Sequence, residues 1–200
     1  AHKVDTVFGL PGAQTYALIE ALRQHKDEVK FISSRHEQGC AYMAFGYAKS
    51  TGKEGVYAVV PGPGVLNTTA ALCTAHNAPV LCLTGQIPSN FIGAGHGALH
   101  ELPDQLATLG TLTKWAARIN HPGEVPSIMS EAFKYLRSGR IQPVAIEVPA
   151  DVFATRGTVD MDYPDLPIPV LNPDPEKIKS AAEYIKNAKK PMIMVGSGAV

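Results

Sequence analysis

Short apolar runs alternate with longer amphipathic stretches along most of this 200-residue chain. The short runs are rich in β-branched residues and indicate strands, whereas the longer stretches carry apolar residues at a period of 3.6 and indicate helices. The pattern predicts strands near 4–8, 29–32, 56–60, 80–84, 115–119 and 144–148. Because strands that alternate with helices build parallel βα units, we expect an α/β fold with a six-stranded parallel sheet flanked by helices.

Helices are expected between these strands, near 14–24, from Arg35 onward, at 66–75 and at 124–137. The second of these helices is unusually rich in small side chains, namely Gly39, Ala41, Ala44, Gly46 and Ala48. Glycine inside a helix is destabilising unless something compensates for it. Two interpretations stay open: another protein surface approaches this helix closely, or the small residues fit a tight contact with the sheet.

The composition of the chain changes after residue 155. Prolines at positions 164, 167, 169 and 173 and the lack of a periodic pattern predict an extended linker over 156–174. Beyond it, a helix near 175–188 with proline in its first turn and a strand near 191–195 predict the beginning of a central α/β domain over 175–200. We therefore expect a first domain over 1–155 and a chain that is part of a longer protein.

Charge and cysteine content narrow the class of protein. Eighteen basic residues balance eighteen acidic ones, so neither nucleic acid nor an anionic membrane surface is an expected partner. No run reaches the roughly 18 apolar residues of a membrane helix, and the N-terminus lacks the pattern of a secretory signal. Cys40, Cys73 and Cys82 show no CxxC spacing. We therefore expect buried, reduced thiols in a cytoplasmic protein.

Three loops, at 9–12, 35–38 and 61–64, follow consecutive predicted strands. In an open parallel sheet, ligands bind outside the carboxyl ends of the strands, so these loops lie at the functional edge. The Gly-Pro-Gly of the third loop does not complete a dinucleotide fingerprint, because Asn67 stands where the third glycine belongs, and no GxxxxGK[ST] motif occurs. Neither a nicotinamide cofactor nor a Walker-type nucleotide site is expected here.

Taken together, the segments around these loops resemble one group of thiamine-diphosphate-dependent enzymes, that of acetolactate synthase, pyruvate oxidase and benzaldehyde lyase. The resemblance extends in order to about Phe153 and includes the pyrimidine-binding fold of these enzymes. It rests on VDTVFGLPG at 4–12, on RHE at 35–37 with GYA at 46–48 and TG at 51–52, on PGPG at 61–64 with Asn67, on TGQIP at 84–88, and on PVAIEVPADV at 143–152. One position departs from the pattern: Pro61 stands where serine is usual.

The resemblance implies that Glu37 hydrogen-bonds the N1′ atom of the cofactor's aminopyrimidine ring. A carboxyl group in a desolvated cleft keeps its proton more readily, so it can share that proton with a weakly basic ring nitrogen. The resemblance further implies that the cofactor contacts Pro11, Gly12, Pro61, Gly62, Asn67 and Gln86. Without the resemblance, the simpler interpretation is that Glu37 is an exposed carboxylate that complements the dipole of its helix.

Gln14 and His100 are expected to act beside Glu37 as catalytic residues. Counting back from the Thr-Lys-Trp segment at 113–115, which resembles that of benzaldehyde lyase, His100 falls where related enzymes have an active-site glutamine. Gln14 falls where that lyase has a histidine. An imidazole there can move protons near neutral pH. The alternative is that His100, and more so His96, are loop histidines that bond to the backbone.

The enzymes of this group bind the cofactor's diphosphate through Mg²⁺, which a GDG…N segment of a separate C-terminal domain holds. No Gly-Asp-Gly occurs in this sequence, so the resemblance places the Mg²⁺ ligands outside it and no metal ligand within it. It also implies a homodimer or homotetramer with the active site at the subunit interface. Some members carry FAD against the central domain, which leaves FAD as an open expectation.

The leading functional hypothesis is an acetolactate-synthase-like enzyme that decarboxylates a 2-keto acid and transfers the remaining unit to an acceptor. Benzaldehyde-lyase-like cleavage of an acyloin, simple decarboxylation and acyl-CoA lyase activity are alternatives within the same cofactor class. A noncatalytic binding module of the same fold is an alternative from another class. The presence of Glu37 argues against such a module, because a degenerate domain has no need for a carboxyl group at this point.

Overall fold

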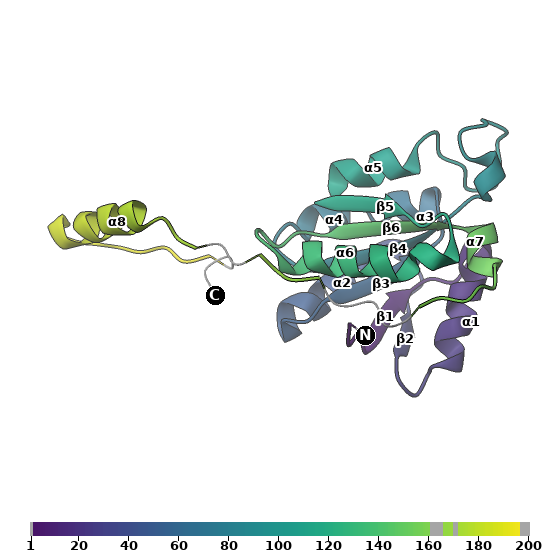
Figure 1. Cartoon of the computed structure of the whole chain (residues 1–200), viewed down its shortest axis with the longest axis horizontal. Helices are drawn as coiled ribbons and strands as arrows, with labels where there is room; N and C mark the ends of the chain where they lie inside the picture. The colour runs from purple at the N-terminus through teal and green to yellow at the C-terminus, as the bar shows by residue number, and fades with distance from the viewer. Residues whose placement is uncertain (1, 161–165, 170–171, 197–200) are drawn as a thin grey trace.

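A computed structural model of the chain describes residues 2–160, 166–169 and 172–196. Its centre is a sheet of six strands in the order β2-β1-β3-β4-β6-β5, and every neighbouring pair is parallel (Figure 1). The strands are β1 (Thr6–Gly9), β2 (Lys30–Ser33), β3 (Gly55–Val59), β4 (Val80–Gln86), β5 (Trp115–Arg118) and β6 (Val144–Pro149). The prediction of a six-stranded parallel sheet is confirmed.

Helices cover both faces of the sheet and make the domain three-layered (Figure 1). The helices are α1 (Tyr16–Gln24), α2 (Glu37–Thr51), α3 (Pro63–Leu66), α4 (Thr69–Thr74), α5 (Gln105–Leu112), α6 (Val125–Arg137), α7 (Ala150–Ala154) and α8 (Pro175–Asn187), with short 3-10 turns η1 (Ala13–Thr15), η2 (Ser89–Phe91) and η3 (Pro122–Glu124). Successive strand residues point to opposite faces. Phe8 and Tyr57 accordingly pack with α2, α4 and α5, whereas Val7 and Val56 pack with α1, α6 and α7.

The strand order reverses direction between β1 and β3, because the chain first moves outward to β2 and then returns past β1. Ligands in open α/β sheets bind at such a switch point, beyond the carboxyl ends of the strands. The loops that follow β1 and β3 therefore lie at this point. A second reversal occurs where β6 inserts between β4 and β5, and it brings the chain after β4 to the same edge.

Most predicted helices match, and the differences have local causes. The helix predicted at 66–75 is split into α3 and α4, because a turn at Asn67 and Thr68 interrupts it. Helix α5 escaped prediction because glycine and threonine lower its helix propensity, although the Asp104 side chain caps it by accepting from the Ala107 N–H. Cys40 and Cys82 are buried as expected, but Cys73 is exposed, since it lies off the buried stripe of α4.

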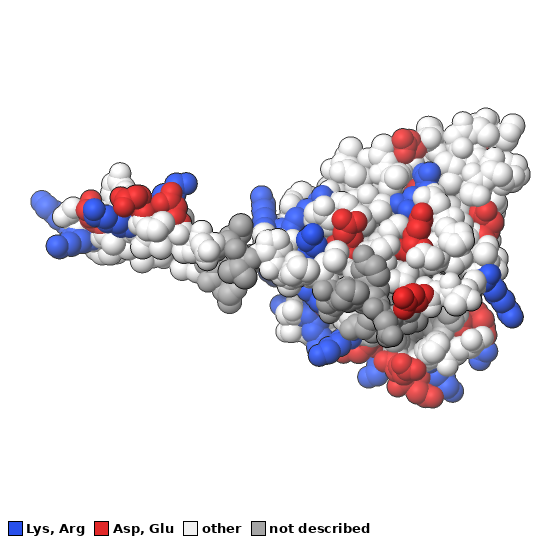
Figure 2. All heavy atoms as spheres, viewed as in Figure 1, with Lys and Arg blue, Asp and Glu red and all other residues white. Residues whose placement is uncertain are grey.

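The chain beyond the sheet contains α8, whose side chains are all exposed. The strand predicted at 191–195 is not formed, because no described segment pairs with it and a strand depends on hydrogen bonds to a neighbour. Parts of the predicted linker, 161–165 and 170–171, lie outside the described residues, and the division into domains stays a prediction. Lys and Arg are interspersed with Asp and Glu over the visible face in Figure 2, as the balanced composition predicts.

Candidate functional site

Two glycine turns at the carboxyl edge of the sheet bring the loops after β1 and β3 into contact. A Cβ on Gly12 would lie 2.2 Å from the Val60 side chain, so only glycine allows this approach. Pro61 to Gly64 form a type II′ turn: Gly62 has φ 59° and ψ −117°, and the Gly64 N–H donates to the Pro61 carbonyl. The backbone of both loops is therefore accessible at close range to a ligand at the switch point.

Glu37 stands beside this turn as the first residue of α2. The helix begins there because His36 caps it, its Nδ1 accepting from the Gln38 N–H. The Asn67 side chain donates to Glu37 Oε2 at 2.9 Å, and Gly64 lies below the Glu37 side chain. In the described part of the chain, no residue bonds to the other carboxylate oxygen, and the side chain is half-buried. The bond from Asn67 orients one oxygen and leaves the other available.

This geometry bears on both interpretations of Glu37. A carboxylate in the first turn of α2 does complement the helix dipole, as the simpler interpretation holds. That interaction does not require a partner from another loop, yet Asn67 is thirty positions away and comes from the loop after β3. The described residues alone do not desolvate Glu37. The expected desolvated cleft therefore needs a further surface over this edge.

Gln14 and His100, eighty-six positions apart, are hydrogen-bonded to each other: His100 Nδ1 lies 2.9 Å from Gln14 Oε1. The Gln14 amide nitrogen donates to the Leu99 carbonyl at 3.0 Å, and Gln14 itself is buried. The structure thus pairs two residues that the sequence had singled out independently. Contrary to the alternative considered for a loop histidine, the hydrogen bond of the His100 ring goes to a side chain and not to the backbone.

The backbone of His100 is strained, with φ 71°, a value that residues other than glycine seldom adopt. It is fixed from below by Gly62, where an added Cβ would lie 2.4 Å from the His100 carbonyl oxygen. Strained positions that persist in a folded protein cluster at functional sites, because surrounding contacts must hold them in place. His100 is therefore a positioned residue, in contrast to His96, which is exposed and contacts the Phe91 ring edge-on.

Under these loops lies a buried polar network that the sequence did not indicate. Glu147 of β6 is fully buried; it accepts from Arg118 Nε at 2.5 Å, from Gln105 at 2.8 Å and from Gln86 at 3.2 Å. Gln105 also accepts the Gly62 N–H at 2.8 Å and donates to the Gly85 carbonyl. The network joins β6 and α5 to the turn at Gly62. A polar residue inside the apolar run of β6 was the available signal.

The remaining predicted cofactor contacts lie at different depths. Pro11 is exposed at the edge, Pro61 is buried, and Gly85 packs against both Pro61 and the Gln14 backbone. Gln86 is buried, and its amide bonds to Glu147 and to the Ile87 N–H, so it belongs to the network. Its expected contact with the cofactor stays a prediction.

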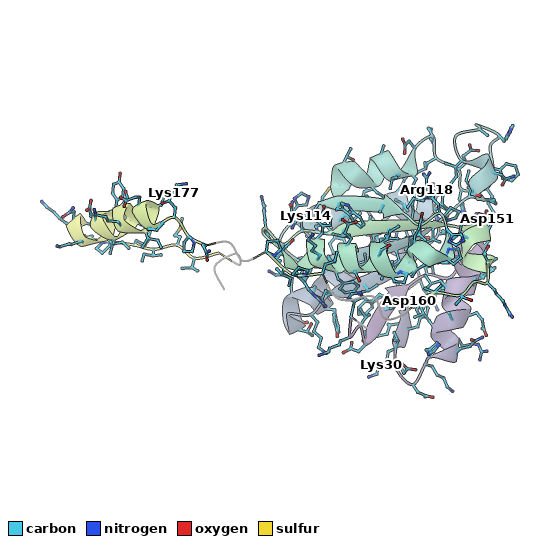
Figure 3. All side chains as sticks on the ribbon, in the orientation of Figure 1. Lys30, Lys114, Arg118, Asp151, Asp160 and Lys177 are labelled. Carbon is cyan, nitrogen blue, oxygen red and sulfur yellow. The ribbon has the colours of Figure 1, made fainter. Side chains whose placement is uncertain are left out.

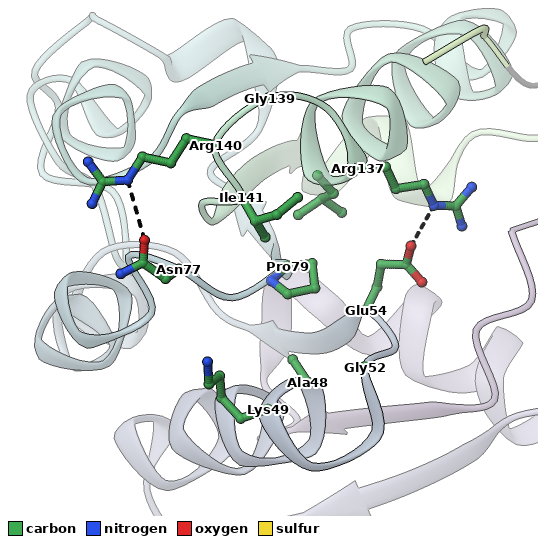
Figure 4. A pocket seen from close by; sticks show the side chains of 11 residues that line it. Ala48, Lys49, Gly52, Glu54, Asn77, Pro79, Arg137, Gly139, Arg140 and Ile141 are labelled. Carbon is green, nitrogen blue, oxygen red and sulfur yellow. Dashed lines mark hydrogen bonds and ion pairs between the residues drawn. The ribbon is translucent and has the colours of Figure 1, made fainter. Parts of the chain in front are cut away.

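A cleft of about 900 Å³ lies at the opposite, amino edge of the sheet and includes none of the predicted site residues. Figure 4 shows Arg137 paired with Glu54 on one side of it and Arg140 with Asn77 on the other. Lys114 shapes this region because its ammonium group donates to three carbonyl groups of residues 135, 138 and 140, at the end of α6 and in the loop after it. Burial lowers the pKa of Lys114.

Two kinds of feature are absent from the described ranges of the chain. No group of three or more His, Cys, Asp or Glu side chains is arranged to hold a metal ion there. Within the same ranges, no helix has the length and apolar content to cross a membrane.

Comparison with known proteins connects this geometry to a family. The family "Thiamine pyrophosphate enzyme, N-terminal TPP binding domain" matches residues 1–108. Similar proteins include the "Probable 2-ketoarginine decarboxylase AruI" of Pseudomonas aeruginosa, which is 36% identical over 100% of this chain and 36% of its own length. An acetolactate synthase of Arthrospira platensis is 36% identical over 100% of this chain and 35% of its own length. The acetolactate synthase isozyme 2 large subunit of Escherichia coli is 36% identical over 99% of this chain and 35% of its own length.

The chain spans about a third of the length of these relatives. The family match covers more than half of the chain, including Glu37, the turn at Gly62 and His100, while Glu147 lies beyond it. The expectation drawn from the sequence motifs is confirmed at the level of family and cofactor: the chain belongs to the thiamine-diphosphate-dependent enzymes and carries their N-terminal cofactor-binding domain.

Proposed function

We propose that this chain is the aminopyrimidine-binding part of an acetolactate-synthase-like enzyme that decarboxylates a 2-keto acid and joins the remaining unit to an acceptor. The observation that carries the proposal is the Glu37–Asn67 hydrogen bond beside the glycine turn at Gly62. It places an oriented carboxylate at the switch point, where α/β folds bind ligands. Two acetolactate synthases among the relatives support this version of the activity.

The residues fit the pyrimidine end of thiamine diphosphate. Asn67 orients one oxygen of Glu37 and leaves the other to meet a ring nitrogen, while Gly12, Gly62 and Gly64 sit where side chains would collide with their surroundings. When bound, the cofactor supplies the nucleophilic carbon and the electron sink. Glu37 holds a proton at the ring nitrogen, and the glycine turns and Pro11 limit the position of the ring.

The other half of the site is proposed to come from outside this chain segment. The half-exposed Glu37 needs a cover, and Tyr42, further along α2, is 38% exposed. A second subunit over this helix, in a homodimer or homotetramer, desolvates the carboxyl group. Of the small residues of α2, Ala41, Ala44 and Ala48 are buried against the sheet of this chain, so Gly46, which is exposed, is the small residue that such a subunit can approach. Mg²⁺ and its ligands for the diphosphate belong to that other half, and FAD, where present, belongs to the central domain.

The proposed substrate is a small 2-keto acid, with an acyloin as the product or as the substrate of the reverse cleavage. The relative named as a 2-ketoarginine decarboxylase supports simple decarboxylation as a second candidate. Turnover of pyruvate, 2-ketoarginine, benzoylformate, benzoin and oxalyl-CoA by the intact enzyme separates these activities. Acetolactate formed from pyruvate supports the leading version, and an aldehyde without carboligation supports the second candidate.

The role of Glu37 is tested by exchange of the cofactor's C2 proton in the intact enzyme loaded with thiamine diphosphate and Mg²⁺. We expect Glu37→Gln to slow this exchange about 100-fold or more, as for loss of a positioned acid–base group. Glu124→Gln is the matched control, because Glu124 also lies at a helix start but bonds to the Asn120 backbone N–H. Rapid exchange in Glu37→Gln would refute the assignment and favour a noncatalytic module.

A further inference from the structure

The hydrogen bonds of Gln14 determine which nitrogen of His100 carries the proton. The Leu99 carbonyl oxygen, 3.0 Å from the Gln14 side chain, can only accept, so the amide group must turn its NH₂ toward it. The carbonyl oxygen of the same amide then faces His100 Nδ1 at 2.9 Å. That oxygen can also only accept, and the ring nitrogen opposite it must therefore donate. A neutral imidazole with a proton on Nδ1 has an unprotonated Nε2.

We propose that Gln14 is a positioning residue that holds His100 as the Nδ1–H tautomer, and that His100 Nε2 is the proton acceptor for the substrate in this site. The inference rests on the proposed function and deepens it, because it replaces two equivalent catalytic candidates with two different roles. In the described part of the chain no group bonds to Nε2, and His100 is only partly buried. The acceptor atom is therefore accessible from the carboxyl edge.

The ring cannot easily escape this arrangement, because its backbone is fixed from two directions. Gly62 abuts the His100 carbonyl group, and Leu99, its neighbour in the chain, is tied to Gln14. The strained φ of 71° at His100 requires such support. Gln105 adds to it from below by accepting the Gly62 N–H. The surroundings thus specify one ring position and one tautomer.

The charged groups on the adjoining elements are directed elsewhere. Glu101, the next residue in the chain, accepts the backbone N–H groups of Gly95 and Ala98. Glu147 is paired with Arg118 below the turn, and Glu37 is bonded to Asn67. Gln14, the side chain that bonds the ring, is neutral. In the described part of the chain, therefore, no carboxylate bonds to the His100 ring.

This arrangement gives the site a function that a glutamine at position 100 lacks. Imidazole Nε2 can take one proton from a substrate hydroxyl group as the O–H bond breaks and the Nε2–H bond forms. Returning that proton to the product restores the neutral ring, so no further reactant is needed. An amide nitrogen or oxygen cannot cycle in this way at neutral pH. The ligand chemistry that matches Nε2 is a hydroxyl group next to the bond that is made or cleaved.

The tautomer is tested without turnover, by solid-state NMR of the intact enzyme labelled with ¹⁵N-histidine and free of cofactor at pH 8. The resonances of His100 are those lost in His100→Gln. We expect Nδ1 protonated and Nε2 unprotonated in the wild type, and a mixture of tautomers in Gln14→Leu, where the accepting oxygen is gone. A wild-type His100 with its proton on Nε2 would overturn the proposal, as would an unchanged tautomer in Gln14→Leu.

The proton-accepting role is tested by the pH profile of kcat with pyruvate as the substrate. If the enzyme does not turn over pyruvate, the profile is measured with whichever of the compounds named above it does turn over. The wild type should lose activity on the acid side as the ring becomes protonated. His100→Gln should lower kcat on the order of 100-fold and abolish that acid limb. Gln14→Glu keeps an acceptor for Nδ1 but adds a negative charge that favours the protonated ring, so it should move the limb upward by about one pH unit.

The control variant is His96→Gln, which removes an exposed loop histidine and should keep the wild-type profile. An acid limb that persists in His100→Gln, or one that does not move in Gln14→Glu, contradicts the assignment. These failures are distinguishable from failure of the proposed function. If the role of Glu37 is wrong, C2–H exchange is unaffected by Glu37→Gln whatever the tautomer of His100; if only His100 is wrong, that exchange still depends on Glu37.

Discussion

The two edges of the same six-stranded sheet differ in how their polar groups are used. At the amino edge, Lys49 and Arg137 occupy the last turns of α2 and α6, where positive charge complements the helix dipoles. At the carboxyl edge, Glu37 and His100 each use one polar atom in a bond to another loop, and among the described residues each keeps a second polar atom without a partner. Figure 3 locates Lys114 and Asp151 toward the opposite ends of the domain.

The contrast shows that cleft size alone does not identify the site. The cleft of about 900 Å³ belongs to the amino edge, where Arg137 pairs with Glu54 and Arg140 with Asn77. Glycine has different roles at the two edges as well. Gly139 at the amino edge has φ 53° and nothing within 4 Å of an added Cβ, whereas Gly62 has φ 59° and the His100 carbonyl at 2.4 Å. These two glycines share a positive φ, and they differ in the close approach of the His100 backbone to Gly62.

The largest difference between the two edges is expected in the kcat/KM of the alanine variants of Gly62 and Gly139. Both pay about 1–2 kcal/mol for a side chain at positive φ. Gly62→Ala should also displace the His100 backbone and lower kcat/KM about 10- to 100-fold, since small displacements of positioned groups are costly. Gly139→Ala should change stability alone. Thermal unfolding and steady-state kinetics of both variants decide this; equal kcat/KM in the two would remove the distinction between the edges.

A smaller effect is expected where buried anchors are removed. Gln105→Leu leaves the Gly62 N–H and the Gly85 carbonyl without their partner, and should cost about 1–3 kcal/mol of unfolding free energy. Lys114→Met removes the donor to three carbonyl groups and should cost about 1–2 kcal/mol.

Despite similar losses of stability in urea unfolding, only Gln105→Leu should lower kcat, by several-fold, because only Gln105 supports the turn under His100. Gln105→Glu keeps an acceptor for the Gly62 N–H. We nevertheless do not expect it to have the wild-type kcat, because its carboxylate is repelled by that of Glu147. Loss of kcat in Lys114→Met of the same size would show that general destabilisation, and not the position of the turn, controls activity.

The sequence predicted what depends on local pattern and short motifs. All six strands follow from runs of apolar residues, and Glu37 follows from its motif and its place after β2. What it could not predict depends on contacts between distant segments. Gln105 was missed because α5 has weak helix propensity and its polar partner Glu147 lies forty-two residues further on. The pairing of Gln14 with His100 required the strand order, which no local pattern contains.

The smallest effect concerns two carboxylates that anchor loops, one at each edge. Burial raises the pKa of Asp151, but hydrogen bonds from Ser89 lower it, and the net shift is downward. Ser89 begins the loop that leads to His100. Hydrogen bonds from Lys53 and Tyr47 likewise hold the pKa of Asp5 below its usual range at the amino edge. A depressed pKa means that each contribution to stability is present above the ordinary carboxyl pKa, near 4, and is lost as pH falls below it.

Asp151→Asn and Asp5→Asn should therefore lower Tm slightly at pH 7, and the difference from the wild type should shrink as pH falls below about 4, because the unfolded chain then binds protons that the folded carboxylates, with their depressed pKa, do not yet bind. Asp151 is exposed and Asp5 is partly exposed, so salt should reduce the two effects. Only Asp151→Asn should also lower kcat/KM, by two- to threefold, since its loop carries the His100–Gln14 pair. If Asp5→Asn changed kcat/KM as much, the amino edge would be coupled to the site, and the separation of roles between the edges would have to be abandoned.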